Sequence, residues 1–314
     1  MKLRRDRVVV VLATKVYVYR FSDLKLLDQI NTQPNPRGLA ALCPHPSNTV
    51  LACPGVNRGH VRVELYDVRK STIITAHESD LARLALSADG ALVATASDKG
   101  TLLRVFDTHT GAQLRELRRG VDRAAIYSIA FDADAKFLAC SSDKGTVHIF
   151  SLADGAGGAA ARRVAAGGAA GGPDAPRPGA APGGADAAAA TGDQPANARS
   201  NLSFLRRVIP GLASSYLESE WSFAQVHGLD APTLCAFGAE PNTIVVVGAD
   251  GSFLVSKFAE GGECERLSFA KFVRSPDEDD DAAAPWQADA ANANPNKPPK
   301  PPAAKPAPPK PPAN

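Results

Sequence analysis

Short apolar stretches alternate with turns along most of the chain, and the pattern repeats. The segment "LALSADGALVATASDKGTLLRVFDTHTG" (84–111) aligns with "SIAFDADAKFLACSSDKGTVHIFSLADG" (128–155), and both contain the pentapeptide SDKGT. Weaker copies occupy residues 40–67 and 235–258. Because each copy consists of short apolar runs split by turns such as "SADG" and "DKG", with little helical periodicity, the pattern predicts β-strands.

The spacing of the copies indicates the fold. The last strand of each copy opens with a glycine, and successive glycines lie 41, 45 and 106 residues apart (Gly59, Gly100, Gly145 and Gly251). A period in the low forties with several short strands is typical of a four-stranded propeller blade. The usual WD dipeptide is absent, although "FD" and "YD" stand near its place. We therefore expect an all-β, WD40-like propeller of about five to six blade equivalents, formed by residues 1–152 and 218–274.

The longest spacing exceeds one period by about 60 residues, which predicts an inserted loop at 153–217. Residues 154–199 are almost all Ala, Gly, Pro and Asp, a composition that favours disorder because little of it can be buried. Residues 201–217 differ, since their apolar residues recur mostly at steps of three and four, with a break at Pro210–Gly211. This second part predicts a short amphipathic segment.

The C-terminal residues 275–314 contain an acidic run, Asp277 to Asp281, followed by a stretch rich in proline and lysine. This composition predicts an extended, disordered tail. The tail either keeps the protein soluble or offers proline-rich motifs to a partner.

Charge and cysteine content narrow the function classes. The 314 residues carry a formal net charge of only +2, so attraction to phosphate must come from local clusters. Five widely spaced cysteines without CxxC motifs predict buried free thiols in a reducing compartment. We expect a cytoplasmic protein, because no signal peptide and no apolar stretch of membrane-spanning length is present. Without a GxSxG elbow, a phosphate-binding glycine loop or HExxH, we expect no enzyme activity, cofactor, metal or nucleic-acid partner.

One charged cluster stands out, at the end of a predicted strand in "QLRELRRGVDR" (113–123). Successive side chains of a strand point to opposite faces, so Arg118 and Arg119 should diverge and could serve two neighbouring anion sites. Gly120 would permit a sharp exit that a side chain would obstruct. Hydroxyl, imidazole and guanidinium groups stand on both sides of the pair in the repeat, and together they suit a phosphorylated ring.

Each of these features also has a purely structural interpretation. Paired arginines at a strand end are often a solvated edge, and Ser or Thr beside "DKG" often serve the turn. His148 in "VHIF" could be a core histidine with its hydrogen bonds satisfied. The residues alone leave both interpretations open.

The chain resembles the PROPPIN family. "LRRG" (117–120) matches the family's Phe/Leu-Arg-Arg-Gly signature in its leucine form. "TASDKGTLLRVFDT", "ELRRG", "IYSIAF", "SSDKGTVHIF", "EWSF" and "CAFGAEPN" follow in the family's order. The resemblance covers residues 1 to about 274 apart from the insert, and it implies a seven-bladed propeller that binds phosphatidylinositol 3-phosphate and phosphatidylinositol 3,5-bisphosphate.

The resemblance also implies roles for particular residues. Arg118 would serve a first headgroup pocket and Arg119 a second, with Gly120 completing the motif. The first pocket would include His77, Ser97, Thr101 and Arg104, and the second would include Arg123, Ser142, Thr146 and His148. The family's membrane-inserting loop joins the third and fourth strands of its sixth blade, where the insert falls. Its membrane-contacting residues would be Leu202, Phe204, Leu205, Val208, Ile209, Leu212 and Tyr216.

As a family member, the protein would work at phagophore (preautophagosomal), endosomal or vacuolar membranes as a peripheral protein and recruit autophagy machinery, notably a lipid-transfer protein. Two departures qualify this expectation. The chain begins where the family's second blade should be under way, so the first blade would be missing and strand edges would be exposed. The insert is also long. The alternatives are a protein-interaction scaffold that does not bind lipid, or a truncated product without function.

Overall fold

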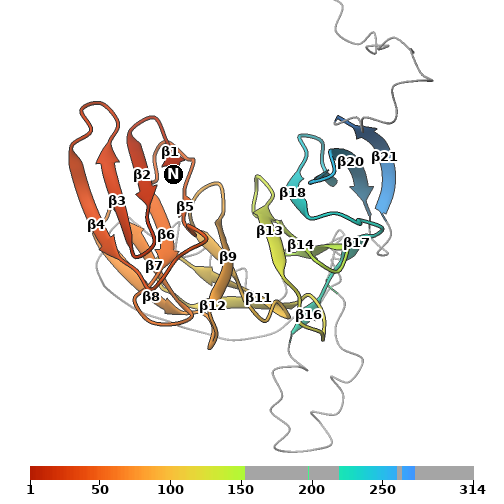
Figure 1. The fold of residues 1–314 in the computed structure, drawn as a ribbon, viewed down its shortest axis with the longest axis horizontal. Coiled ribbons are helices and arrows are strands. Elements are labelled where there is room, and N and C mark those ends of the chain that lie inside the picture. The colour runs from red at the N-terminus through yellow and green to blue at the C-terminus, as the bar shows by residue number, and fades with distance from the viewer. Residues whose placement is uncertain (153–196, 198–218, 260–263, 273–314) are drawn as a thin grey trace, which may run out of the picture. The chain divides into compact units, whose positions relative to one another are not determined.

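The computed structural model describes residues 1–152, 197, 219–259 and 264–272, and every regular element in these ranges is a β-strand. The strands form five sheets, which we name A to E in chain order (Figure 1). This confirms the expected all-β, propeller-type fold. The expectations for disorder at 154–199, an amphipathic segment at 201–217 and a disordered tail at 275–314 lie outside the described residues, except for Asn197.

The sheets have the following strands. Sheet A contains β1 (Lys2–Leu3), β2 (Arg7–Val11), β3 (Lys15–Arg20) and β4 (Leu26–Asn31). Sheet B contains β5 (Ala41–Leu42), β6 (Val50–Pro54), β7 (His60–Leu65) and β8 (Lys70–Thr75). Sheet C contains β9 (Leu81–Leu86), β10 (Leu92–Ser97), β11 (Leu102–Asp107), β12 (Gln113–Arg118) and, paired parallel to β12, β16 (Glu220–Trp221). Sheet D contains β13 (Ile126–Phe131), β14 (Phe137–Ser142), β15 (Val147–Ser151) and β17 (Ala224–Val226). Sheet E contains β18 (Thr233–Phe237), β19 (Thr243–Gly248), β20 (Ser252–Phe258) and β21 (Cys264–Lys271).

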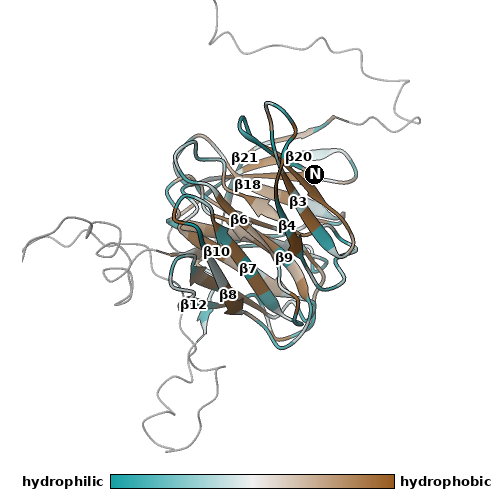
Figure 2. Cartoon of the chain, turned by 90° about the vertical axis from the view of Figure 1, so that its left-hand side faces the viewer, coloured by the Kyte–Doolittle hydropathy of each residue, from teal (hydrophilic) through white to brown (hydrophobic). Residues whose placement is uncertain are grey.

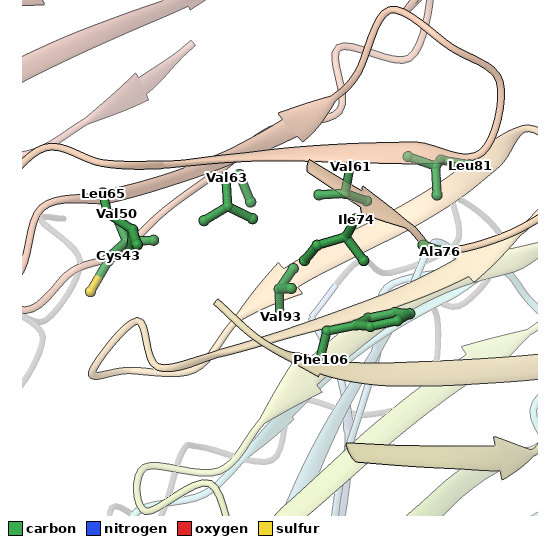
Figure 3. Close-up of a cluster of buried hydrophobic side chains, with 11 residues drawn as sticks. Cys43, Val50, Val61, Val63, Leu65, Ile74, Ala76, Leu81, Val93 and Phe106 are labelled. Atoms are coloured by element: carbon green, nitrogen blue, oxygen red, sulfur yellow. The ribbon is translucent and has the colours of Figure 1, made fainter. Parts of the chain in front are cut away.

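Sheet C packs on sheet B through one face and on sheet D through the other. Val93 of β10 and Phe106 of β11 join a core with Val61 and Ile74 of sheet B (Figure 3). Their alternate neighbours along the same strands, including Ala94 and Val105, join a second core with sheet D instead; its sheet D members are Ile126, Leu138, Cys140 and Phe150. The two-residue period of the apolar pattern therefore gives sheet C two buried faces.

The hydropathy of the chain follows the strands. Figure 2 shows apolar colour along the strands and polar colour in many of the connecting turns. The edge strands β4 and β21 are more exposed: Leu26, Leu27, Leu267 and Phe269 are between 38% and 54% accessible. Four of the five cysteines are buried, Cys264 is partly buried and all five are free thiols, as the sequence predicted.

A glycine with positive φ precedes the third strand in several sheets. Gly100 has φ of 65°, and a Cβ there would overlap the backbone carbonyl oxygen of Ala124, in the segment leading to the next sheet. Gly59 has φ of 70° and approaches the carbonyl of His77 in the same way. The repeated glycine is needed both for the turn and for close packing of the following segment.

Candidate functional site

The register of sheet C determines where the two arginines point. Arg118 pairs with Leu102, and two residues earlier Glu116 pairs with Arg104. Leu117, between them, packs in the core shared with sheet D. Arg118 and Glu116 therefore belong to the opposite face, which packs on sheet B and which we call the B–C side.

Arg119 continues the extended backbone by one residue, because its N–H donates to the carbonyl of Thr101 at 3.0 Å. By alternation its side chain belongs to the face of sheet C toward sheet D, the C–D side. The electrostatic neighbours of Arg119 include Cys140 and Asp143 of the sheet D segment, consistent with this placement. Both arginine side chains are buried, at 7% and 6% exposure. The dipeptide thus supplies one cation to each side of one sheet.

A histidine, a threonine and an ion pair lie together on the B–C side. His77 Nε2 lies 3.0 Å from Thr95 Oγ1. Arg104 donates from Nη1 to the carbonyl of Ala76 at 2.6 Å and from Nε to Glu116 Oε2 at 2.9 Å. Burial, followed by the charge of Arg104, lowers the pKa of His77 to about 4, so this imidazole is neutral at pH 7.

Arg118 is held from the outer edge of the sheet. Its Nε donates to Ser219 Oγ at 2.8 Å, and Ser219 directly precedes β16, the added parallel strand. Ser97 is buried at an irregularity in the β9–β10 register, and Thr101 contributes the carbonyl that receives the N–H groups of Arg119 and Gly120. The structure thus brings His77 and Arg104 together. Thr101 instead contacts Arg119 and Gly120, through its backbone carbonyl.

On the C–D side, Arg119 donates to backbone carbonyls. Its Nε donates to Gly100 O at 2.9 Å and its Nη2 donates to Asp122 O. Burial is the main cause of a lowered pKa for this guanidinium. A buried cation held by carbonyl dipoles is well suited to receive an anion.

His148 occupies the same side. Its Nδ1 lies 3.3 Å from Ser222 Oγ, and its ring stacks at 6.3 Å on Phe150, which belongs to the core between sheets C and D. Burial lowers the pKa of His148 to about 4, and the nearby charge of Arg119 adds to the shift. The C–D side therefore also presents a neutral buried imidazole beside an arginine.

The other residues predicted for the second pocket, Ser142, Thr146 and Arg123, have different surroundings. Ser142 is buried, and its Oγ accepts the Lys144 N–H at 3.5 Å. Thr146 Oγ1 lies 3.4 Å from His227 Nδ1. The Arg123 side chain is 74% exposed and pairs with Asp98 at 3.4 Å, and no contact joins it to Arg119 in the described residues.

The conformational role expected for Gly120 is wrong. Gly120 does not have a positive φ, and a Cβ built on it would meet no atom within 4 Å. The chain leaves β12 through ordinary backbone conformations, so a side chain would not obstruct it. The close approach belongs instead to Gly100, twenty positions earlier.

Several contact residues were not predicted. Thr95 lies two positions before Ser97 in β10, and strand alternation could have suggested it as a partner of His77. Ser222 lies within "EWSF", one of the family-like segments, and His227 follows shortly after. No local sequence pattern could have indicated Ser219, because it lies 101 residues from Arg118 in the sequence.

Asn197, the one described residue within the insert, joins the strands that come before and after the insert. Asn197 Nδ2 donates to Ser151 O and to Glu220 Oε2, each at 2.6 Å, and its Oδ1 accepts the Ser151 N–H. Glu220 in turn pairs with Arg115 of β12 at 3.0 Å. The amide of Asn197 thus satisfies the backbone of Ser151 as a neighbouring strand would.

Two features of other protein classes are absent from the described residues. No group of three or more His, Cys, Asp or Glu side chains is arranged to hold a metal ion. No helix in those residues is long and apolar enough to cross a membrane.

The PROPPIN family model matches residues 1–166, slightly more than half of the 314 residues. The chain belongs to the PROPPIN family. This PROPPIN is 40% identical over 279 residues to autophagy-related protein 18e of Arabidopsis thaliana, covering 87% of the chain and 63% of that relative. It is 46% identical over 156 residues to WD repeat domain phosphoinositide-interacting protein 2 of mouse, covering 48% of the chain and 35% of the relative. The chain thus spans less than two thirds of the length of either relative.

Solved structures share the fold of this PROPPIN. Kluyveromyces lactis Hsv2 superposes with a TM-score of 0.59 at 20% identity, covering 86% of this chain and 72% of that one. A structure described as the complex of KlAtg21 with the coiled coil of AgAtg16 gives a TM-score of 0.58 at 22% identity, covering 87% and 70%. At these identities the likeness extends to the fold alone.

Proposed function

We propose that this PROPPIN binds 3-phosphorylated phosphoinositides through two headgroup sites, one on each side of sheet C. The observation that carries the proposal is the placement of Arg118 and Arg119 on opposite faces, each face with a buried histidine. The name of the mouse relative, a phosphoinositide-interacting protein, and the LRRG motif (117–120) support the same ligand class.

The chemistry of the two sides suits a phosphate monoester. A guanidinium offers forked donors to phosphate oxygens, and serine, threonine and histidine groups can satisfy the remaining lone pairs. His77 and His148, with pKa values near 4, are neutral before binding and can donate one N–H each. A phosphate dianion would also compensate the buried charge of Arg119, which donates hydrogen bonds to backbone carbonyls and feels the charges of Asp143 and Asp122 without an ion pair among the described residues.

Two weak sites on one rigid body give retention on membranes rich in the lipid, because the second contact is intramolecular. We propose that the segment 201–217 adds apolar contact with the bilayer. The protein would then act without catalysis, as a cytoplasmic, peripheral adaptor on phagophore, endosomal or vacuolar membranes. Its partner there would be autophagy machinery such as a lipid-transfer protein.

Flotation with liposomes tests this proposal. Vesicles containing phosphatidylinositol 3-phosphate should carry the parent chain upward, and vesicles of the same charge made with phosphatidylserine should not. Arg118→Thr with Arg119→Thr should abolish lipid-dependent flotation and leave the circular dichroism spectrum unchanged. Arg20→Thr with Arg266→Thr is the matched control, because it removes the same charge from sheets A and E. Equal flotation of the parent and the arginine-pair variant would disprove lipid binding at these sites.

One observation favours a second function. Both guanidiniums already have internal partners, Ser219 for Arg118 and the carbonyls of Gly100 and Asp122 for Arg119. If these contacts only fix the end of β12, the protein is a scaffold for other proteins. The arginine-pair variant would then lose thermal stability and show no change in flotation.

A further inference from the structure

A cavity lined by cations lies away from the arginine pair. Its volume is about 500 Å³, and it is lined by Lys2 of β1, residues 37–40 between β4 and β5, and Arg83–Leu84 of β9. Segments associated with three different sheets therefore each bring one positive charge to the same space: Lys2, Arg37 and Arg83. No carboxylate is among the residues that line it, and neither are Arg118 and Arg119.

Internal hydrogen bonds hold two parts of the wall of this cavity, the Arg83 side chain and the loop backbone that carries Arg37. Arg83 donates from Nε to Tyr127 O at 2.8 Å and from Nη1 to Ala82 O at 2.9 Å, which holds the plane of its guanidinium. The loop that carries Arg37 is closed by Asn35, whose Nδ2 donates to Leu39 O and whose Oδ1 accepts the Leu39 N–H. Asn35 itself is 4% exposed. A ligand would therefore pay little to order Arg83 and this loop backbone.

The positive charges in the cavity repel one another. Burial lowers the pKa of Arg83, and the charge of Arg37 lowers it further. A smaller cavity of about 170 Å³ shares Arg37 but is also lined by Arg123, Asp98 and Asp143. In the smaller cavity the protein supplies its own anions, whereas in the larger one the residues that line it supply none. An anion from solution would relieve this repulsion.

We propose that the larger cavity binds a small polyanion carrying two or more phosphate groups, as a site separate from the two sides of sheet C. Three cations around one cavity, with Arg83 held in place by the protein, match a ligand with several phosphates better than a single carboxylate. The phosphates can come from a soluble compound or from a lipid headgroup, and these sources can be distinguished by experiment.

Isothermal titration calorimetry with the full chain tests the site, with inositol hexakisphosphate as the probe. Lys2→Gln with Arg37→Gln should weaken probe binding by roughly tenfold for each cation removed. Arg83→Gln should weaken it by a similar factor, and thermal melting checks that this variant is folded. Lys25→Gln with Arg69→Gln, which removes two exposed cations from other turns, should bind the probe like the parent.

Two further measurements separate this site from the proposed lipid sites. Arg118→Thr with Arg119→Thr should keep probe binding, because neither arginine lines the cavity. If the arginine-pair variant loses the probe while the cavity variant keeps it, the inference is overturned. Equal weakening in the cavity variant and in the Lys25 and Arg69 control would also overturn it, by showing non-specific charge attraction. Flotation of the cavity variant identifies the source: a loss on phosphoinositide vesicles indicates a lipid headgroup, and unchanged flotation indicates a soluble ligand.

Discussion

On the B–C side of sheet C, Arg104 forms an ion pair with Glu116, whereas on the C–D side Arg119 is held by backbone carbonyls. The two sides share other features. Each has an arginine of the pair and a buried histidine whose pKa lies near 4. The repeated sequence SDKGT also stands at the end of the second strand on each side, at 97–101 and 142–146.

The difference shows how one repeat can produce two candidate anion sites with unlike charge. On the B–C side a protein carboxylate cancels one of two arginine charges. On the C–D side the position of Arg104 in the repeat is taken by a histidine that burial keeps neutral. Arg119 is the only buried arginine there among the described residues, and the charges of Asp143 and Asp122 act on it without forming an ion pair. The proposed lipid binding should therefore depend more on a single residue at the C–D side than at the B–C side.

The largest expected effect concerns the turn that joins the two sides. Gly100→Ala should destabilise the fold by roughly 4 kcal/mol, from strain at positive φ and overlap with the carbonyl of Ala124. Gly120→Ala is the matched control and should leave the melting temperature unchanged, because open space surrounds its Cβ position. Thermal melting of both variants compares them directly. Equal destabilisation would mean that the LRRG glycine has the structural role that we assign to Gly100.

The histidines should make both sides sensitive to acid. Their pKa values near 4 in the folded state lie below the value of about 6.5 in the unfolded chain, so the unfolded state binds more protons between these values. Stability is therefore full above pH 6.5 and falls as the pH drops toward 4, by about 3 kcal/mol for each histidine. Urea unfolding at pH 7, 5.5 and 4.5 measures the slope.

Substitution distinguishes the contributions of the two sides. His77→Gln and His148→Gln should each reduce the slope by about half, and the double variant should remove most of it. If one of the single variants keeps the full pH dependence of the unfolding free energy, the histidine on that side is hydrated. The two sides would then not share a buried neutral histidine.

Much of this arrangement could be predicted because strand periodicity has a direct geometric consequence. The apolar alternation predicted the strands of sheet C, and the position of the arginines at the end of "QLRELRR" predicted that they diverge. The spacing of the turn glycines predicted the repeat unit, and Gly59, Gly100, Gly145 and Gly251 all have positive φ.

The remaining details depend on contacts that no local pattern encodes. The pairing of Arg104 with Glu116 follows from the β11–β12 register, which the turn between these strands sets. Ser219 reaches Arg118 only because β16 adds to the edge of sheet C after the insert. The predicted conformational role of Gly120 was wrong because a glycine in a motif need not occupy a glycine-specific conformation. Predicting each of these features requires the path of the backbone and not the sequence alone.

Single substitutions compare the contributions of Arg118 and Arg119 to lipid binding. Arg119→Gln should weaken binding to vesicles with phosphatidylinositol 3-phosphate by about tenfold, and Arg118→Gln by about threefold. The smaller loss is expected because Arg104 remains on the B–C side, whereas the nearby Arg123 is exposed and paired with Asp98. Vesicle titration at constant salt measures both. The reverse order would show that the ion pair on the B–C side does not share in binding.

The smallest effect tests the role of the carboxylate itself. Glu116→Gln keeps an acceptor for Arg104 but removes the negative charge, so vesicle binding should strengthen by about twofold, as expected for a partly exposed ion pair. Glu64→Gln is the matched control, because Glu64 pairs with Arg62 on the face of sheet B that points away from sheet C. It should leave binding unchanged. If Glu116→Gln weakens binding instead, the carboxylate positions Arg104 for the ligand rather than competing with it, and the two sides differ in geometry and not in charge.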